Sequence, residues 1–314
     1  MPDPIRTIVV GVAHPDAADP ALRAAADLAL ASGAELHLVH ALEAPLLGSR
    51  SAGLQPDYMH HRDGRDGRVR DALRAALKEA AAGRGEVRSR AWVYRITPGE
   101  AILTVARRVD AGVIVVGASR HGAVERALLG TAAQRVIRAA PVPVLVVRRD
   151  FGELPRRVLL TTDLSGLSAT VHETGLDAVE NLFPGRELEV RSLAVVFPGM
   201  LPPPLKDDAL THAAQAELAA FLAARRPRST AVEPATRIGR AAEEIPAEAA
   251  EWDADLLVLG THARHGMERI LAGSVAESAL AHADCNVLVV PPTVAHAAEH
   301  PDESSEPALT AAHA

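Results

Sequence analysis

The chain runs twice through one order of strands and helices, and this internal repeat constrains its fold more than any other feature. Three pairs of segments align without a gap: Gly117 with Gly260, Gly130 and Thr131 with Gly273 and Ser274, and residues 144–147 with 287–290. Each copy alternates short apolar runs with segments of helical periodicity. Such alternation is typical of a parallel sheet with right-handed crossover helices, so we expect two α/β domains in tandem.

The apolar periodicity predicts the position of each element. The expected strands are 5–12, 34–42, 86–96, 113–117 and 142–147 in the first copy, and 157–163, 188–197, 231–238, 255–260 and 286–290 in the second. The expected helices are 20–32, 66–82, 98–110 and 131–140, then 165–182, 206–224, 240–252 and 274–283. Asp19 before Pro20 is a typical N-cap, and Gly33 a typical helix end. Thr131 and Ser274 each open a capping-box pattern, completed by Gln134 and Glu277.

Length and composition set the limits of the chain. Its 314 residues suit two domains, which we place at 1–149 and 156–291, with a disordered tail at 292–314 that is rich in Ala, Glu, Ser and Pro. Aromatic residues make up only 3%, so the cores must consist of Ala, Val, Leu and Ile. The single Cys285 excludes an intramolecular disulfide, and we expect it to be a small buried apolar residue.

Charge and hydropathy bear on partners and location. The net charge of −7 gives no support for a general nucleic-acid or anionic-membrane surface. The amino end lacks the apolar run of a signal peptide, and no apolar run reaches membrane-spanning length. We therefore expect a cytoplasmic protein with neither a nucleic-acid nor a membrane partner. Scattered histidines such as His60 and His61 lack the spacing of a zinc site.

Residues 260–274 are the strongest candidate for a binding site. They join the carboxyl end of an apolar strand to the start of a helix, which is where ligands bind in open α/β sheets. The unpaired N–H groups and partial positive charge of a helix N-terminus suit a phosphate. Gly260 and Gly273 would let the backbone approach a ligand closely. Ser274 taken alone is more typical of a helix cap than of a phosphate-binding residue, and it is the full spacing with Gly260 and Gly273 that favours binding.

This stretch resembles the nucleotide-binding signature of the universal stress protein family, which is Gly-x-x-Gly, nine residues, then Gly-Ser/Thr. Gly260, Gly273 and Ser274 match it in full spacing, and Ala263 stands where the second Gly is usual. The resemblance continues through 280–290 and, in two copies, covers nearly the whole chain. It implies two doubly wound, five-stranded parallel-sheet domains that are Rossmann-like and similar to the adenine nucleotide alpha hydrolases.

The resemblance also implies that the two copies are not equal. An Asp commonly follows the family's first strand, near the adenosine; the second copy has Asp163, whereas the first copy has Ala13. Arg120 stands in the first copy where a small residue is expected. The second copy is therefore the expected ATP site, with or without Mg²⁺. The expected binding residues are Thr162, Asp163, Gly260, His262, Ala263, Arg264, Gly273, Ser274 and Val275.

Three functions remain open from the sequence. The first is a stress-response protein that binds an adenine nucleotide and signals by its bound state. The second is a tandem scaffold without a ligand, which Ala13, Arg120 and Ala263 would favour. The third, which we rank lowest because no P-loop or nucleophile elbow is present, is a slow ATP hydrolase; we expect a binding protein and not an enzyme. Asp163 taken alone is as compatible with a structural role, as an N-cap or loop residue, as with ligand binding. The last strands of the two copies, 142–147 and 286–290, can pair as an intramolecular pseudo-dimer, and a homo-oligomer is equally open.

Overall fold

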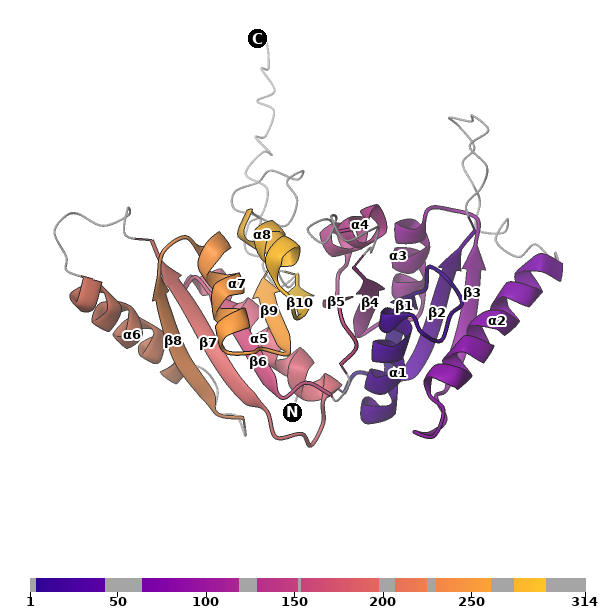
Figure 1. The fold of residues 1–314 in the computed structure, drawn as a ribbon, viewed down its shortest axis with the longest axis horizontal. Coiled ribbons are helices and arrows are strands. Elements are labelled where there is room, and N and C mark those ends of the chain that lie inside the picture. Colours follow the sequence, from indigo (N-terminus) through magenta and orange to yellow (C-terminus); the bar gives the residue numbers. More distant parts are fainter. Residues whose placement is uncertain are drawn as a thin grey trace, which may run out of the picture.

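A single ten-stranded sheet runs through the whole molecule (Figure 1). The structure is a computed structural model, and it describes residues 4–42, 64–118, 129–151, 154–197, 207–224, 230–260 and 274–291. The strand order is β3-β2-β1-β4-β5-β10-β9-β6-β7-β8, so each half contributes five neighbouring strands. Every pair within a half is parallel. The predicted fold class, two five-stranded parallel α/β units in tandem, is confirmed.

The elements follow the order predicted from the repeat. The first half consists of β1 (Thr7–Gly11), α1 (Pro20–Ser32), β2 (Glu35–Ala41), α2 (Gly64–Ala80), β3 (Ser89–Tyr94), α3 (Pro98–Arg108), β4 (Val113–Gly117), α4 (Thr131–Ala139) and β5 (Val144–Val147). The second half consists of β6 (Arg157–Thr162), α5 (Gly166–Leu182), β7 (Glu189–Val196), α6 (Asp207–Ala223), β8 (Val232–Ile238), α7 (Ala241–Glu251), β9 (Leu256–Gly260), α8 (Ser274–His282) and β10 (Asn286–Val290). The predicted tail, 292–314, lies outside the described residues.

Local chemistry sets the helix ends. Asp19 caps α1 by accepting hydrogen bonds from the N–H groups of Ala21 (2.8 Å) and Leu22 (3.2 Å). Gly33 ends the same helix in the left-handed region, at φ 71°, which glycine adopts at little cost. Both predicted caps are confirmed. Asp110 (φ 50°) and Asp253 (φ 54°) are also left-handed, at matching points after α3 and α7. The repeat therefore extends to backbone conformation.

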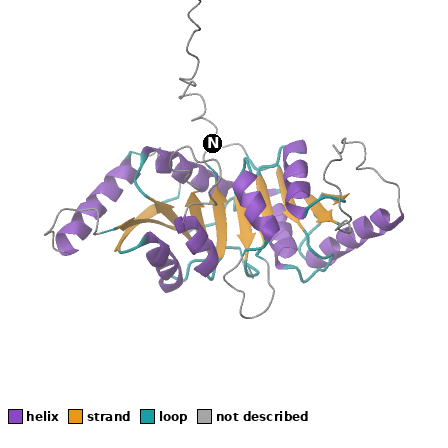
Figure 2. Cartoon of the chain, turned by 90° about the horizontal axis from the view of Figure 1, so that it is seen from above, coloured by secondary structure: helices purple, strands orange, loops and turns teal. Residues whose placement is uncertain are grey.

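Alternate residues of each strand enter two apolar layers, one on each face of the sheet. Val10 packs in the layer with α1, α2 and α5, whereas its neighbour Val9 packs in the layer with α3, α4, α7 and α8. Figure 1 shows the second set of helices on the upper side of the sheet, and Figure 2 shows the strands side by side between the layers. Both layers continue across the two halves. Cys285 is buried in one of them, as predicted, and burial raises the pKa of its thiol to about 11.

The two halves meet at β5 and β10, as predicted, and this pair is antiparallel. Val146 lies opposite Val287 and Val144 opposite Val289. The side-chain oxygen of Asn286 accepts hydrogen bonds from the N–H groups of Arg148 (2.8 Å) and Arg149 (3.1 Å) at the end of β5. Because the central pair is antiparallel, the carboxyl ends of the strands face opposite edges of the sheet in the two halves.

The antiparallel joint also explains why a short linker is enough. The carboxyl end of β5 lies at the same edge of the sheet as the amino end of β6, so the chain need not cross the sheet between them. Asp255 holds the far end of the linker by accepting hydrogen bonds from the N–H groups of Arg156 and Arg157, both 2.9 Å. The linker is thus held by Asn286 of β10 at its start and by Asp255, the residue before β9, at its end.

Candidate functional site

The second-half candidate site lies where β6 and β9 end side by side. Val158 of β6 pairs with Leu256 of β9, and both strands run in the same direction. Gly260 is the last residue of β9 and lies opposite Val290 of β10. The helix after this strand, α8, has Ser274 as its first helical residue. The helix therefore starts where predicted, but Ser274 is not the N-cap that the capping-box pattern makes it. Val275, in its first turn, is half-buried and packs against the apolar layer. The fold therefore brings a helix N-terminus to the carboxyl edge of β9.

The loop that follows β6 is fixed by two buried hydroxyl groups. Thr162 and Ser168 share a hydrogen bond of 2.8 Å between their side-chain oxygens, and both are buried. The N–H of Leu164 donates to Thr162 Oγ1 (3.0 Å), and that of Asp163 donates to Ser168 Oγ (3.2 Å). Buried hydroxyls that accept backbone N–H groups hold a loop in one conformation. This geometry gives Thr162 a positioning role and places Asp163.

Asp163 is an exposed loop residue, and the N-cap of α5 is Ser165. Asp163 Oδ1 accepts hydrogen bonds from the N–H (3.0 Å) and hydroxyl (2.6 Å) of Ser165. Ser165 Oγ in turn accepts from the N–H of Ser168 (3.1 Å). Leu164 between them has a left-handed backbone, at φ 62°, which costs about 1 kcal/mol or more for a residue with a branched side chain. Asp163 is thus a loop residue and not the N-cap, and its part in ligand binding stays a prediction.

Four of the expected binding residues, His262, Ala263, Arg264 and Gly273, lie outside the described residues. The structure thus places Thr162, Asp163, Gly260, Ser274 and Val275. The backbone of the first two comes from the end of β6, and that of the last two from the start of α8. Their shared position at the carboxyl edge agrees with the rule for ligand sites in open α/β sheets.

The first half has the same backbone plan at its own carboxyl edge but not the same chemistry. Ile8 of β1 pairs with Val113 just as Val158 pairs with Leu256, so Ala13 occupies the position of Asp163. Ala13 has no carboxylate to offer there. Arg120, the other predicted departure from the binding pattern, lies outside the described residues.

One predicted cap in the first half is wrong. The sequence pattern makes Thr131 the N-cap of α4, but the structure makes it the first helical residue and Gly130 the N-cap. Gln134 Nε2 donates to the carbonyl of Leu129 (3.1 Å) rather than completing a capping box with Thr131. Glycine and threonine are both acceptable N-caps, so two adjacent candidates cannot be separated by residue type alone.

Sequence reasoning missed two residues at the second-half edge. Ser168 holds the loop of Asp163, but a serine in the first turn of a helix is too common to stand out. Phe197 directly follows β7, the neighbour of β6, and is 46% exposed. The apolar pattern of the sequence places it only at the end of the strand expected over 188–197. An exposed aromatic ring at this edge could have been noticed, because the chain has only four phenylalanines.

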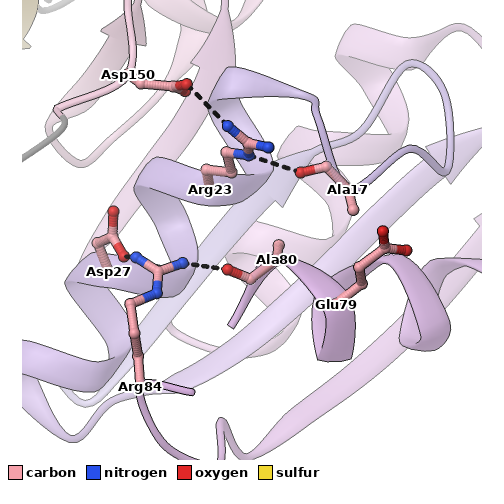
Figure 3. Close-up of a pocket in the computed structure, with 7 residues that line it drawn as sticks. All are labelled: Ala17, Arg23, Asp27, Glu79, Ala80, Arg84 and Asp150. Atoms are coloured by element: carbon pink, nitrogen blue, oxygen red, sulfur yellow. Dashed lines mark hydrogen bonds and ion pairs between the residues drawn. The ribbon is translucent and has the colours of Figure 1, made fainter. Parts of the chain in front are cut away.

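A charged hollow lies elsewhere, beside α1 and the end of α2 (Figure 3). Arg23 donates to Asp150 (3.1 Å) and to the carbonyl of Ala17 (2.8 Å), and Arg84 donates to Asp27. Both guanidinium groups are thus held by the chain itself. Among the described residues, no group of three His, Cys, Asp or Glu side chains is arranged to hold a metal ion. No helix in the described ranges is long and apolar enough to cross a membrane.

Comparison with known proteins identifies the class that this fold and site define. The model of the universal stress protein family matches residues 4–148 and again residues 155–291. The chain therefore belongs to the universal stress protein family, with two family units in tandem. The resemblance seen in the sequence is confirmed.

Curated relatives carry the same family name. The universal stress protein E homolog of Haemophilus influenzae is 28% identical over 170 residues, which is 51% of this chain and 55% of that protein. Universal stress protein Rv2005c of Mycobacterium tuberculosis is 29% identical over 194 residues, 57% of this chain and 62% of that protein. The chain thus spans a little over half the length of the curated relatives it matches.

Solved structures share the whole architecture. A functionally unknown protein from Pseudomonas aeruginosa PAO1 covers 94% of this chain and 96% of its own, with a TM-score of 0.66 and 21% identity. A universal stress protein from Archaeoglobus fulgidus covers 91% of this chain and 98% of its own, with a TM-score of 0.64 and 16% identity. At these identities the likeness shows the fold.

Proposed function

We propose that the second half binds ATP or a related adenine nucleotide at its carboxyl edge, and that the protein serves stress response or signalling through its bound state. The observation that carries the proposal is Asp163, an exposed carboxylate fixed beside the end of β9 by Ser165 and Ser168. A carboxylate so placed can accept hydrogen bonds from ribose hydroxyls.

The residues around Asp163 fit the rest of such a ligand. The start of α8 would offer backbone N–H groups and a positive dipole end to the phosphates. Phe197, on the adjoining strand end, offers an exposed ring face against which a purine could stack. Mg²⁺, if it accompanies ATP, would be held largely by the phosphates themselves. The first half, residues 1–149 in our domain limits, lacks the carboxylate and acts as the partner unit of residues 156–291.

Isothermal titration with ATP, with and without Mg²⁺, tests the proposal. We expect binding by the wild-type chain and at least about tenfold weaker binding by Asp163→Ala or Gly273→Val, which is about 1.4 kcal/mol. Asp163→Asn keeps an oxygen for Ser165 but loses the charge, so it separates the carboxylate's role from that of the loop. The matched control is Thr131→Ala, at the start of α4 in the other half, which should bind as the wild type does.

Each other outcome points to a different function. A wild-type chain that binds no ATP would be a ligand-free tandem scaffold. Loss of binding in Thr131→Ala rather than in Asp163→Ala would move the site to the first half. Chromatography of the same samples for ADP measures turnover, and steady ADP production would make the protein a slow ATP hydrolase.

A further inference from the structure

Charge is divided unevenly between the two halves. Residues 1–150 contain 21 Lys and Arg against 16 Asp and Glu, whereas residues 151–314 contain 12 against 24. The halves therefore carry formal charges of +5 and −12, which together give the −7 of the whole chain. Four of the acidic residues lie in the tail at 292–314, so residues 151–291 carry −8 against the +5 of the first half. Two domains of one fold thus differ in electrostatic potential, and such fields steer association.

The face covered by α3, α4, α7 and α8 shows the same division of charge. The helices α3 and α4 hold four arginines and one glutamate, whereas α7 and α8 hold five glutamates and neither lysine nor arginine. In each half the two helices pack against one another. One end of this face is therefore basic and the other acidic.

Some of these charged side chains already form ion pairs within the chain. Glu248 accepts from Arg191 (2.8 Å) and from Arg237 (2.6 Å), and Arg237 also binds Glu251. Arg135 donates to Glu100 (2.6 Å).

Four exposed charged side chains on the face have no hydrogen bond or ion pair with any residue the structure describes. They are two cations in the first half and two anions in the second: Arg107, Arg138, Glu243 and Glu277. On the opposite face, the half-buried carboxylates of α5, Glu173, Asp177 and Glu180, already interact within the chain. The face covered by α3, α4, α7 and α8, whose helices lie on the upper side of the sheet in Figure 1, thus offers exposed charge of both signs without a partner among the described residues.

The symmetry of the fold places these charges where a second copy can meet them. The strand order reads the same from both ends of the sheet, and the central pair is antiparallel. The α3–α4 and α7–α8 pairs therefore lie at matching distances on either side of the joint. A second copy can pack face to face on the first so that its two halves are exchanged end for end. The acidic α7–α8 pair of each copy then lies on the basic α3–α4 pair of the other.

We propose that this face is a self-association surface, on which α3–α4 of each copy contacts α7–α8 of the other. Such an interface is isologous, so it closes as a dimer and each attractive contact occurs twice. Exposed ion pairs contribute only about 0.2–1 kcal/mol each and are screened by salt. The dimer is accordingly weak and dissociates as ionic strength rises.

Sedimentation velocity of the full chain at about 50 mM and about 500 mM NaCl provides the first test. We expect a concentration-dependent dimer at low salt and a monomer at high salt. A monomer at low salt up to about millimolar protein, a concentration equivalent to about −4 kcal/mol of binding, would overturn the proposal. So would a dimer that salt does not weaken.

Charge reversal gives the second test. Arg107→Glu with Arg138→Glu, and separately Glu243→Arg with Glu277→Arg, should each produce a monomer at low salt. Mixed in equal amounts, the two variants should recover the wild-type dimer, because each reversed end then meets its complement. Arg68→Glu with Lys78→Glu, an equal charge change on exposed positions of α2, is the control that should leave the dimer intact. Failure of the mixture to pair would overturn the proposed arrangement.

Discussion

His37 shows how one buried side chain links protonation to stability. Trp92 Nε1 donates to its Nδ1 at 2.9 Å, so Nδ1 must be unprotonated. Burial, together with the charge of Arg90, lowers the pKa of His37, although Glu35 opposes the shift. An unfolded histidine titrates near about 6.5, so below that pH the unfolded chain binds more protons than the folded one. The contribution of neutral His37 to the free energy of unfolding is therefore fully present above that pH, and it is lost as the pH falls below it.

We predict that His37→Gln weakens this pH dependence. Glutamine can still accept from Trp92 but cannot ionise. The free energy of unfolding in urea should fall by about 1 kcal/mol at pH 8, because packing on Trp92 is lost. Between pH 8 and pH 5.5, however, the variant should lose less stability than the wild type. Equal losses in the two proteins would show that His37 does not titrate in this range.

At the residue scale, the sequence predicts helix ends correctly where the residue type and its neighbours favour a single structural role. Asp19 before Pro20, and Gly33 at a left-handed position, are such cases. It failed where neighbours compete, as at Gly130 and Thr131. It could not foresee Ser168, because the partnership with Thr162 exists only after the strand and helix have been placed in space.

At the scale of elements, a hydrogen bond joins α7 and α8, and it satisfies a carbonyl group that a proline in α7 leaves without a donor. Pro246 lies inside α7 and has no N–H, so the carbonyl of Ala242, four residues earlier, loses its helical donor. The hydroxyl of Ser278 in α8 donates to that carbonyl at 2.9 Å. The hydrogen bond that α7 lacks at this carbonyl is thus supplied by a side chain of α8.

We predict that Ser278→Ala destabilises the wild-type chain by about 1–3 kcal/mol, because the carbonyl of Ala242 is left without a donor. In a Pro246→Ala background the same change should cost less, since the helix then supplies its own N–H. Urea unfolding of the four proteins of this double-mutant cycle measures the coupling. Additive effects, within about 0.5 kcal/mol, would show that the two residues act independently.

Sequence patterns located every strand and helix of the described structure, and their errors lie at the ends. The strands β4 and β10 match the predicted bounds, and β8 differs from them by one residue. The strand β3 was expected over 86–96 but spans Ser89–Tyr94. It is an edge strand that pairs only with β2, so its length depends on that partner and not on its own apolar pattern.

At the scale of the whole molecule, the joint between β5 and β10 decides whether the halves unfold together. The chain has two tryptophans, Trp92 in the first half and Trp252 in the second. Trp92→Phe and Trp252→Phe variants therefore report on one half each. We expect their fluorescence transitions in urea to coincide, because one sheet and two apolar layers run through both halves.

Asn286→Ala should weaken that joint. It removes the acceptor for the N–H groups of Arg148 and Arg149, and we expect a loss of about 1–3 kcal/mol together with a separation of the two tryptophan transitions. Asn286→Asp retains an acceptor oxygen beside both arginines and serves as the control. Coincident transitions in Asn286→Ala would mean that the strands alone couple the halves.

Because the antiparallel joint between β5 and β10 lies within a single chain, the two halves that it connects need not have the same sequence. Two separate, identical subunits meeting along such strands would receive every substitution twice, once on each side of the axis. In a fused chain a substitution occurs once. One half can therefore keep Asp163 while the other has Ala13, and the two can acquire opposite charge, without breaking the contact that holds them together.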